Sequence, residues 1–147
     1  MIGWIDIKSG FLRAVHQRWC QLRGPRLMAD IRDYNHFAAQ TPMGHSACIL
    51  VPNEGGPVFK FIGQTLDQVL PNCRDGMRFA EIPSSIGRTT LTSPFHRVRT
   101  SRQPDCFRGQ YQSSAGKGRF EQLLLPFGNA QLKVCLVHAV YEHEPAW

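Results

Sequence analysis

The sequence lacks the features that mark several large classes of protein. No hydrophobic run approaches the roughly 20 apolar residues that span a bilayer. The opening residues, MIGWIDI, lack the basic start and long apolar core of a signal peptide. No repeat or low-complexity tract interrupts the 147 residues, of which 42% are hydrophobic and 19% charged. We therefore expect one soluble, cytoplasmic domain with no membrane partner.

Closely spaced cysteine pairs are also absent. The chain contains no CxxC motif, and its five cysteines are far apart, at Cys20, Cys48, Cys73, Cys106 and Cys135. An odd number of cysteines on predicted helices and strands favours reduced thiols over a disulfide framework or a zinc finger.

Catalytic and metal-binding signatures are missing as well. No paired carboxylates, Walker lysine or metal-ligand cluster is present. The GHS at 44–46 lacks the strand, turn and helix of a nucleophile elbow, and no helix follows Gly116 and Gly118 to form a phosphate cradle. His138 and His143 lie five residues apart on a predicted strand, so they point to opposite faces and form a poor metal pair. We therefore expect no enzyme and no metal site.

Acidic residues are outnumbered by basic ones, which gives a net charge of +6. The arginines form two groups, Arg13, Arg18, Arg23, Arg26 and Arg32 in the first, and Arg88, Arg97, Arg99 and Arg102 in the second. Such groups attract nucleic acid or an acidic protein surface. Few aromatic residues interleave with them and no nucleic-acid motif occurs, so we expect a solvated basic face and no nucleic-acid partner.

The most informative stretch that is present runs from 119 to 143. It predicts two long strands, Phe120–Phe127 and Leu132–Tyr141, joined by a turn in which Gly128 and Asn129 tolerate a positive φ. Both faces of the second strand are largely apolar. Such a strand belongs in the middle of a sheet that is covered on both sides.

The N-terminal segment predicts one of these coverings. Ser9 is a suitable N-cap, and Gly24 and Pro25 end the helical pattern that follows it. The apolar positions of this helix are Phe11, Leu12, Val15, Trp19 and Leu22. The stripe either covers the sheet or forms a dimer seam around Phe11, Val15 and Trp19. A second, short helix is predicted to start at Asp30.

The middle of the chain predicts more strands and short helices. The strands are 47–52, Val58–Ile62 and Cys106–Gln112, with turns at 53–56 and 113–118. A short helix is predicted at Gln64–Leu70. Met77, Phe79 and Ile82 are expected to contact the core.

A further helix is predicted from Leu91, Phe95 and Val98, which share one face, with Ser93 and Pro94 either starting it or kinking a longer one. The fold class is therefore α+β: a five-stranded antiparallel sheet with short helices on one face and an N-terminal amphipathic helix. The domain spans 9–142, between tails at 1–8 and 143–147.

This order of elements is that of a PAS domain. Four local runs resemble a family of short single-domain bacterial PAS proteins: WCQLRGPRLMADIRDYNHF, FKFIGQTLDQVL, RDGMRFAEI and LLLPFGNAQLKV. The resemblance implies a sensory or protein-interaction module in bacterial signal transduction. It also implies a homodimer and a separate signalling partner protein, because the chain shows no catalytic output region.

The resemblance also suggests where a ligand would bind. We expect the pocket at Phe79, Leu91, Phe95 and His138. The ligand itself is unknown; haem and flavin are the cofactors of similar domains, but neither motif is complete. Cys73 lies in an Asn-Cys-Arg run like the flavin-adduct motif, yet Asp75 and Gly76 follow it. His96 lies on the helix that carries the haem ligand in haem-binding PAS proteins, but the flanking arginines predict that it faces solvent.

His138 supports a second interpretation. A histidine among apolar residues on a central strand needs a hydrogen-bond partner, and a core residue or a ligand would serve. With His138 as general base, the chain would be a small enzyme or carrier that uses a pocket between sheet and helices.

Overall fold

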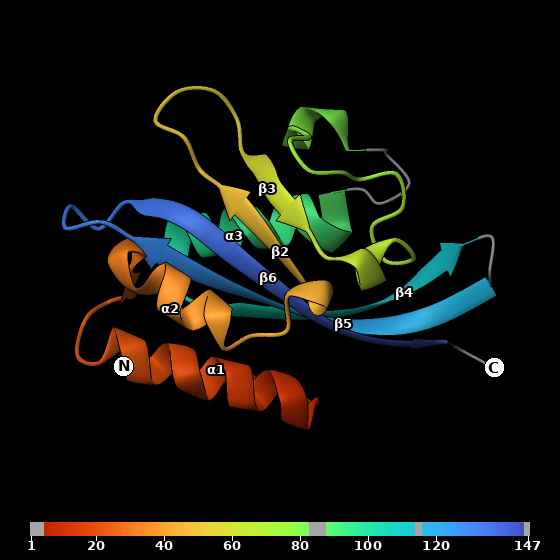
Figure 1. Cartoon of the computed structure of the whole chain (residues 1–147), viewed down its shortest axis with the longest axis horizontal. Helices are drawn as coiled ribbons and strands as arrows, with labels where there is room; N and C mark the ends of the chain where they lie inside the picture. Colours follow the sequence, from red (N-terminus) through yellow and green to blue (C-terminus); the bar gives the residue numbers. More distant parts are fainter. Residues whose placement is uncertain (1–4, 83–87, 114–115, 146–147) are drawn as a thin grey trace.

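A computed structural model describes residues 5–82, 88–113 and 116–145 and shows one sheet with helices on both faces (Figure 1). The helices are α1 (Gly10–Arg23), α2 (Tyr34–Ala39) and α3 (Ser93–Ser101). The strands are β1 (Ala29–Asp30), β2 (Ser46–Leu50), β3 (Val58–Ile62), β4 (Asp105–Ser113), β5 (Gly116–Gly128) and β6 (Val134–Pro145). Short 3-10 turns are η1 (Ile31–Asp33), η2 (Met43–His45), η3 (Gln64–Leu66) and η4 (Phe79–Glu81), and η5 (Arg88–Thr92) is a π-helical turn.

The sheet is six-stranded and mixed, which corrects the prediction of five antiparallel strands. Its main path is β4-β5-β6-β2-β3, and all of these neighbours are antiparallel. β4 pairs with β5 only as far as Leu124, so the last residues of β5 keep an open edge. There β1 pairs in parallel, with Ala29 opposite Phe127. A two-residue strand carries too little periodicity to be seen in the sequence.

The predicted central hairpin is confirmed, but it is longer and turns differently. β6 continues to Pro145, beyond the predicted domain boundary at 142. In the turn, the Asn129 side chain accepts hydrogen bonds from the amides of Gln131 and Lys133, and Leu132 has the positive φ of 61°. Gly128 is required for another reason, since a Cβ there would lie 2.7 Å from the backbone carbonyl oxygen of Lys133.

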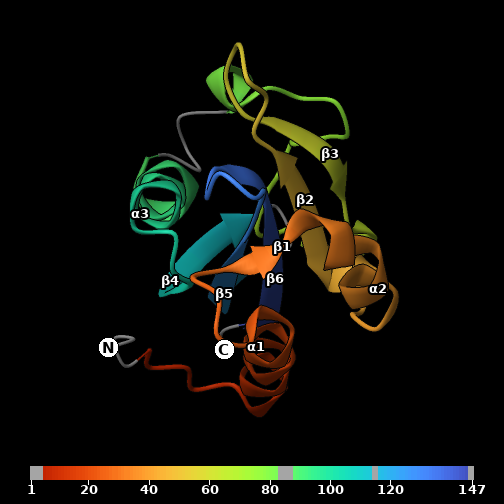
Figure 2. The ribbon, with the colours of Figure 1, turned by 90° about the vertical axis from the view of Figure 1, so that its left-hand side faces the viewer.

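Helix α1 begins as predicted and covers one face of the sheet together with α2 (Figure 2). The hydroxyl of Ser9 accepts from the Leu12 amide at 3.1 Å, which caps the helix. Trp19 is 0% exposed and donates from Nε1 to the Pro126 carbonyl at 3.0 Å, and Val15 is 2% exposed. The apolar stripe is therefore used within the chain. This corrects the predicted dimer seam: Val15 and Trp19 are buried within the chain, and only Phe11 of the three seam residues keeps partial exposure.

The other face is covered by α3 and by short irregular segments (Figure 2). Leu91, Phe95 and Val98 are each 0% exposed, which confirms their shared helical face. The segment starts as the π-helical turn η5 and continues into α3, with Pro94 in its first turn. The helix predicted over 64–70 shortens to the 3-10 turn η3. This face therefore has less regular cover than the face under α1.

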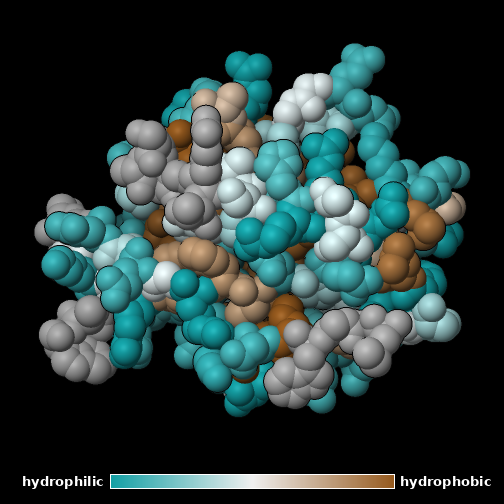
Figure 3. All heavy atoms as spheres, turned by 180° about the vertical axis from the view of Figure 1, so that it is seen from behind, coloured by the Kyte–Doolittle hydropathy of each residue, from teal (hydrophilic) through white to brown (hydrophobic). Residues whose placement is uncertain are grey.

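The surface of the described residues is mostly polar. On the face opposite to that of Figure 1, apolar residues are interspersed with polar ones (Figure 3). The exposed large apolar side chains among the described residues are Leu27, Met43 and Leu132. All five cysteines are unpaired. No described helix has the length and apolar character needed to cross a membrane.

Candidate functional site

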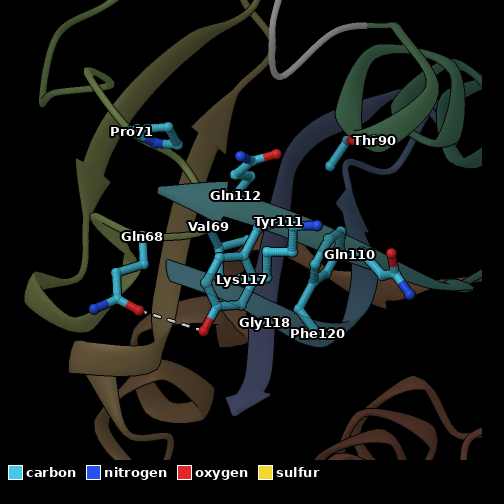
Figure 4. Close-up of a pocket in the computed structure, with 10 residues that line it drawn as sticks. All are labelled: Gln68, Val69, Pro71, Thr90, Gln110, Tyr111, Gln112, Lys117, Gly118 and Phe120. Atoms are coloured by element: carbon cyan, nitrogen blue, oxygen red, sulfur yellow. Dashed lines mark hydrogen bonds between the residues drawn. The ribbon is translucent and has the colours of Figure 1, made fainter. Parts of the chain in front are cut away.

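A pocket of about 580 Å³ opens between the end of the β4–β5 hairpin, the segment after η3 and the π-helical turn η5 (Figure 4). Its lining residues come from four segments: Gln68, Val69, Pro71, Thr90, Gln110, Tyr111, Gln112, Lys117, Gly118 and Phe120. The loop residues and Thr90 stand on opposite sides of the pocket, with the strands between them (Figure 4). We call this the hairpin pocket.

The pairing of Tyr111 with Gly118 shapes the hairpin pocket. These residues are opposite each other in the β4–β5 ladder. A Cβ on Gly118 would lie 2.0 Å from the Tyr111 ring, so only glycine lets the ring lie flat over β5. From this position the Tyr111 hydroxyl donates to Oε1 of Gln68 at 3.3 Å (Figure 4). The ring thus joins the sheet to the loop that forms the opposite wall.

A chain of hydrogen bonds holds Thr90, on the side of the pocket that η5 forms. Tyr141 donates to Oε1 of Gln122 at 2.6 Å, and Nε2 of Gln122 donates to the Thr90 carbonyl at 2.8 Å. Burial, reinforced by the nearby Cys73 thiol, raises the pKa of Tyr141, so its hydroxyl stays protonated and available as a donor. The chain fixes the π-helical turn against the sheet, because the buried Gln122 amide would otherwise lack a partner, which is costly. Thr90 is therefore a positioned part of the wall.

The hairpin pocket offers polar side chains to a small molecule. Among the described residues, the side chains of Gln110, Gln112 and Lys117 have no hydrogen-bond partner. They offer amide donors and acceptors and one positive charge. None of the ten lining residues is a carboxylate, histidine or cysteine. The lining suits recognition of a small polar molecule better than catalysis.

A second pocket of about 640 Å³ lies beside the start of α1, but its charges are already paired. Glu121 accepts from the amides of Lys8 and Ser9 and from Nη1 of Arg108, at 2.7 to 3.0 Å. Arg119 contacts Glu144 at 2.6 Å. Glu121 and Arg108 attach the residues before α1 to the sheet, and Arg119 pairs with Glu144 across β5 and β6, so these charged groups have a structural role.

The four residues predicted to line a ligand pocket do not come together. Phe79 and Phe95 pack with ring centroids 4.8 Å apart, and Leu91 is buried on the same face beneath α3. His138 is on the opposite face, where its ring packs against Tyr34 and Phe37. The prediction placed His138 on the wrong side, because alternation along β6 gives the two faces but does not say which helix covers each.

His138 is a core histidine, which was one of its two interpretations. It is 0% exposed, and its Nδ1 lies 2.8 Å from the Tyr34 hydroxyl. Burial, together with the positive charge of Arg18, lowers the pKa of His138 to about 3, so the ring is neutral. It lines neither pocket described above. A general base must reach its substrate, so the structure gives no support to the enzyme or carrier based on His138.

The two candidate cofactor residues also lie away from the hairpin pocket. Cys73 lines a separate surface pocket, and burial raises the pKa of its thiol to about 11, which disfavours a reactive thiolate. His96 is exposed on α3, as predicted, and lines another surface pocket. The arrangement therefore fits neither a flavin adduct nor a haem ligand in the hairpin pocket.

Most arginines of the first basic group have partners within the chain. Arg18 donates to the Gln40 carbonyl and to Thr41, and Arg26 and Arg32 contact Asp30. Arg13 donates to two carbonyls before α1, those of Ile7 and Lys8. Side chains held in this way are less available to bind phosphates.

Comparison with known proteins gives a weak structural likeness and no match in sequence. No family model matches the chain, and no curated protein matches it in sequence. The structure is similar to a crystal structure of the PAS domain of a protein from Colwellia psychrerythraea, with a TM-score of 0.47 and 10% identity. The match covers 77% of this chain and 96% of that chain. Independently of that likeness, the order that follows β1, with two strands, short helices and three strands, makes the fold PAS-like.

Proposed function

We propose that the chain is a PAS-like sensory module that binds a small polar molecule in the hairpin pocket. The observation that carries this proposal is the pocket itself, about 580 Å³ in volume, whose lining includes Gln110, Gln112 and Lys117 with side chains that have no partner among the described residues. A molecule with carboxylate or amide groups would satisfy Gln110, Gln112 and Lys117 together.

The wall of the hairpin pocket offers a route for a signal. Thr90 lies in the π-helical turn η5, which continues directly into α3. A π-helical turn carries a wider, less stable hydrogen-bond register than an α-helix and often occurs at functional sites. A ligand that contacts Thr90 would change the balance between the two registers and so move α3. The surface of α3 would then report binding to a separate signalling protein or to a second copy of the chain, the partners that we propose.

Native mass spectrometry of freshly purified protein tests the binding. We expect a non-covalent adduct of a small molecule on the wild type, and its loss or marked reduction in Lys117→Ala combined with Gln112→Ala. Lys133→Ala is the matched control, since Lys133 contacts Asn53 on another part of the surface. A wild-type spectrum without an adduct, or an adduct that survives in the double variant, would contradict a ligand in this pocket.

An absorption spectrum of the same preparation, from about 300 to 700 nm, separates coloured from colourless ligands. We expect no haem or flavin band, because His96 and Cys73 both lie outside the hairpin pocket. A band of either kind would show that a cofactor binds elsewhere, and substitution of His96 or Cys73 would then identify its place.

A further inference from the structure

Two histidines that are far apart in the sequence meet at one end of the sheet. His45 ends the turn η2, and His143 lies near the end of β6. Their ring centroids are 6.1 Å apart. The meeting depends on β6 continuing past residue 142, where the sequence had predicted a tail.

The hydrogen bonds around His45 determine which of its nitrogens carries the proton. The Thr65 hydroxyl donates its single hydrogen to the Gly44 carbonyl, at 2.7 Å. Its oxygen, 3.1 Å from Nδ1 of His45, must therefore accept a hydrogen bond from that nitrogen. The proton is then on Nδ1, and Nε2 of His45 carries a lone pair. A histidine held in this way by an oxygen behind it is the usual arrangement of a metal ligand.

His143 supplies a second nitrogen without a partner. Its Nε2 is shielded from solvent and has no hydrogen-bond partner among the described residues. The Tyr111 ring stands against it edge to face, with centroids 6.1 Å apart, and limits its rotation. An imidazole nitrogen that is buried without a partner is costly, and a bound ion would satisfy it.

We propose that His45 and His143 form a binding site for a divalent transition-metal ion such as Zn²⁺, with water in the remaining coordination positions. Zinc binds imidazole nitrogen at about 2.0–2.1 Å, which places the centroids of two rings on one ion roughly 5 to 6 Å apart. The observed separation of 6.1 Å is close to this range. No group of three or more histidine, cysteine or carboxylate ligands occurs among the described residues, so two protein ligands would give modest affinity. It does not require a ligand in the hairpin pocket, although Tyr111 borders both sites.

A long-range ¹H–¹⁵N NMR titration of the whole chain with Zn²⁺ tests the site at the nitrogens themselves. We expect the Nε2 signals of His45 and His143 to shift together, at the same Zn²⁺ concentration, while Nδ1 of His45 stays protonated. The competing pair is His16 Nε2 and Cys20 Sγ on α1, 3.5 Å apart. If Zn²⁺ shifts His16 first, or shifts His45 without His143, the proposal is wrong.

Three variants sharpen this test. His143→Gln should abolish the response of His45 to Zn²⁺. Thr65→Val, which removes the oxygen behind His45, should weaken Zn²⁺ binding on the order of tenfold. His96→Gln, at an exposed histidine on α3, is the control and should change nothing. A His45 response that persists unchanged in His143→Gln would overturn the two-histidine site.

Discussion

The two faces of the sheet are covered by different kinds of structure, and they differ accordingly. On one face, α1 and α2 enclose a core that contains Val15, Trp19 and His138, and the described pockets do not reach this core. On the other, α3 is joined by 3-10 and π-helical turns, and the hairpin pocket opens among them. A regular helix presents a continuous ridge of side chains that fills the surface of a sheet, whereas short turns leave space. The second face therefore has the space that the proposed ligand requires, and the first face does not.

The largest effect that we predict is the loss of Trp19 from the first face. Trp19→Ala removes a fully buried ring and its hydrogen bond to Pro126, so the free energy of unfolding should fall by about 3–5 kcal/mol. Urea denaturation followed by far-ultraviolet circular dichroism would measure this. Leu27→Ala, at a side chain that is 37% exposed, is the control and should cost far less. Equal losses in the two variants would contradict a core under α1.

The next largest effect on stability that we predict concerns Glu121, which attaches the segment before α1 to the sheet. Burial alone would raise the pKa of Glu121, but hydrogen bonds from Lys8, Ser9 and Arg108 outweigh it and lower the pKa. Because the pKa is lowered in the folded state, the stabilisation is present above about pH 4.5 and is lost as the pH falls below it. Glu121→Gln should cost about 1.5–3 kcal/mol at neutral pH.

The measurement for Glu121 is the free energy of unfolding at pH 7 and at acid pH. The wild type should lose more stability on acidification than Glu121→Gln does. Glu54→Gln, at an exposed position in the β2–β3 turn, should behave like the wild type. A variant that matches the wild type at both pH values would show that this attachment contributes little.

His138 should make the first face sensitive to mild acid. Its pKa is about 3 in the folded chain, while an ordinary histidine has a pKa near 6.5. The unfolded chain therefore gains a proton below about pH 6.5 that the folded chain does not take up, and stability falls. Between pH 7.5 and pH 5 this one group should account for about 2 kcal/mol.

Thermal or urea unfolding at those two pH values would check this prediction. The pH-dependent loss should be smaller in His138→Leu by about that amount. Tyr34→Phe removes the hydrogen-bond partner of His138 but keeps the buried ring, so it should retain the pH dependence. The same pH dependence in His138→Leu as in the wild type would contradict a neutral buried histidine.

The smallest predicted effect on stability lies on the second face. Gly118→Ala places a methyl group where the Tyr111 ring lies, so the ring must move and its hydrogen bond to Gln68 is lost. We expect a cost of roughly 1 kcal/mol, because the ring can move into the open pocket. Gly56→Ala is the control, as nothing lies within 4 Å of a Cβ there. A crystal structure of Gly118→Ala with Tyr111 unmoved would contradict this account of the pocket wall.

The sequence predicted well what depends on neighbouring residues. The cap at Ser9, the stripe of α1, the helical face of Leu91 and Phe95, and the central hairpin all follow from local spacing, and the structure contains each of them. The parallel pairing of β1 could not be predicted, because it depends on where β4 stops along β5.

The candidate site was harder to predict, because its residues are brought together by register. Tyr111 meets Gly118 only in the observed pairing of β4 with β5, and Thr90 reaches the pocket through Gln122. In the sequence, the pocket was indicated only by the two polar residues Gln110 and Gln112, which alternate along the third predicted strand. His45 and His143 give no local signal at all, since they belong to different elements.

The alternation of side chains along β6 has a consequence for how this protein can change over time. His138 faces α2 while its neighbours Val137 and Ala139 face the other side, so one strand serves both layers. Substitutions on opposite faces share few contacts, and their effects on stability should add. Residues of the pocket layer can therefore change during evolution while the packed layer is conserved. Such changes would alter recognition without loss of the fold.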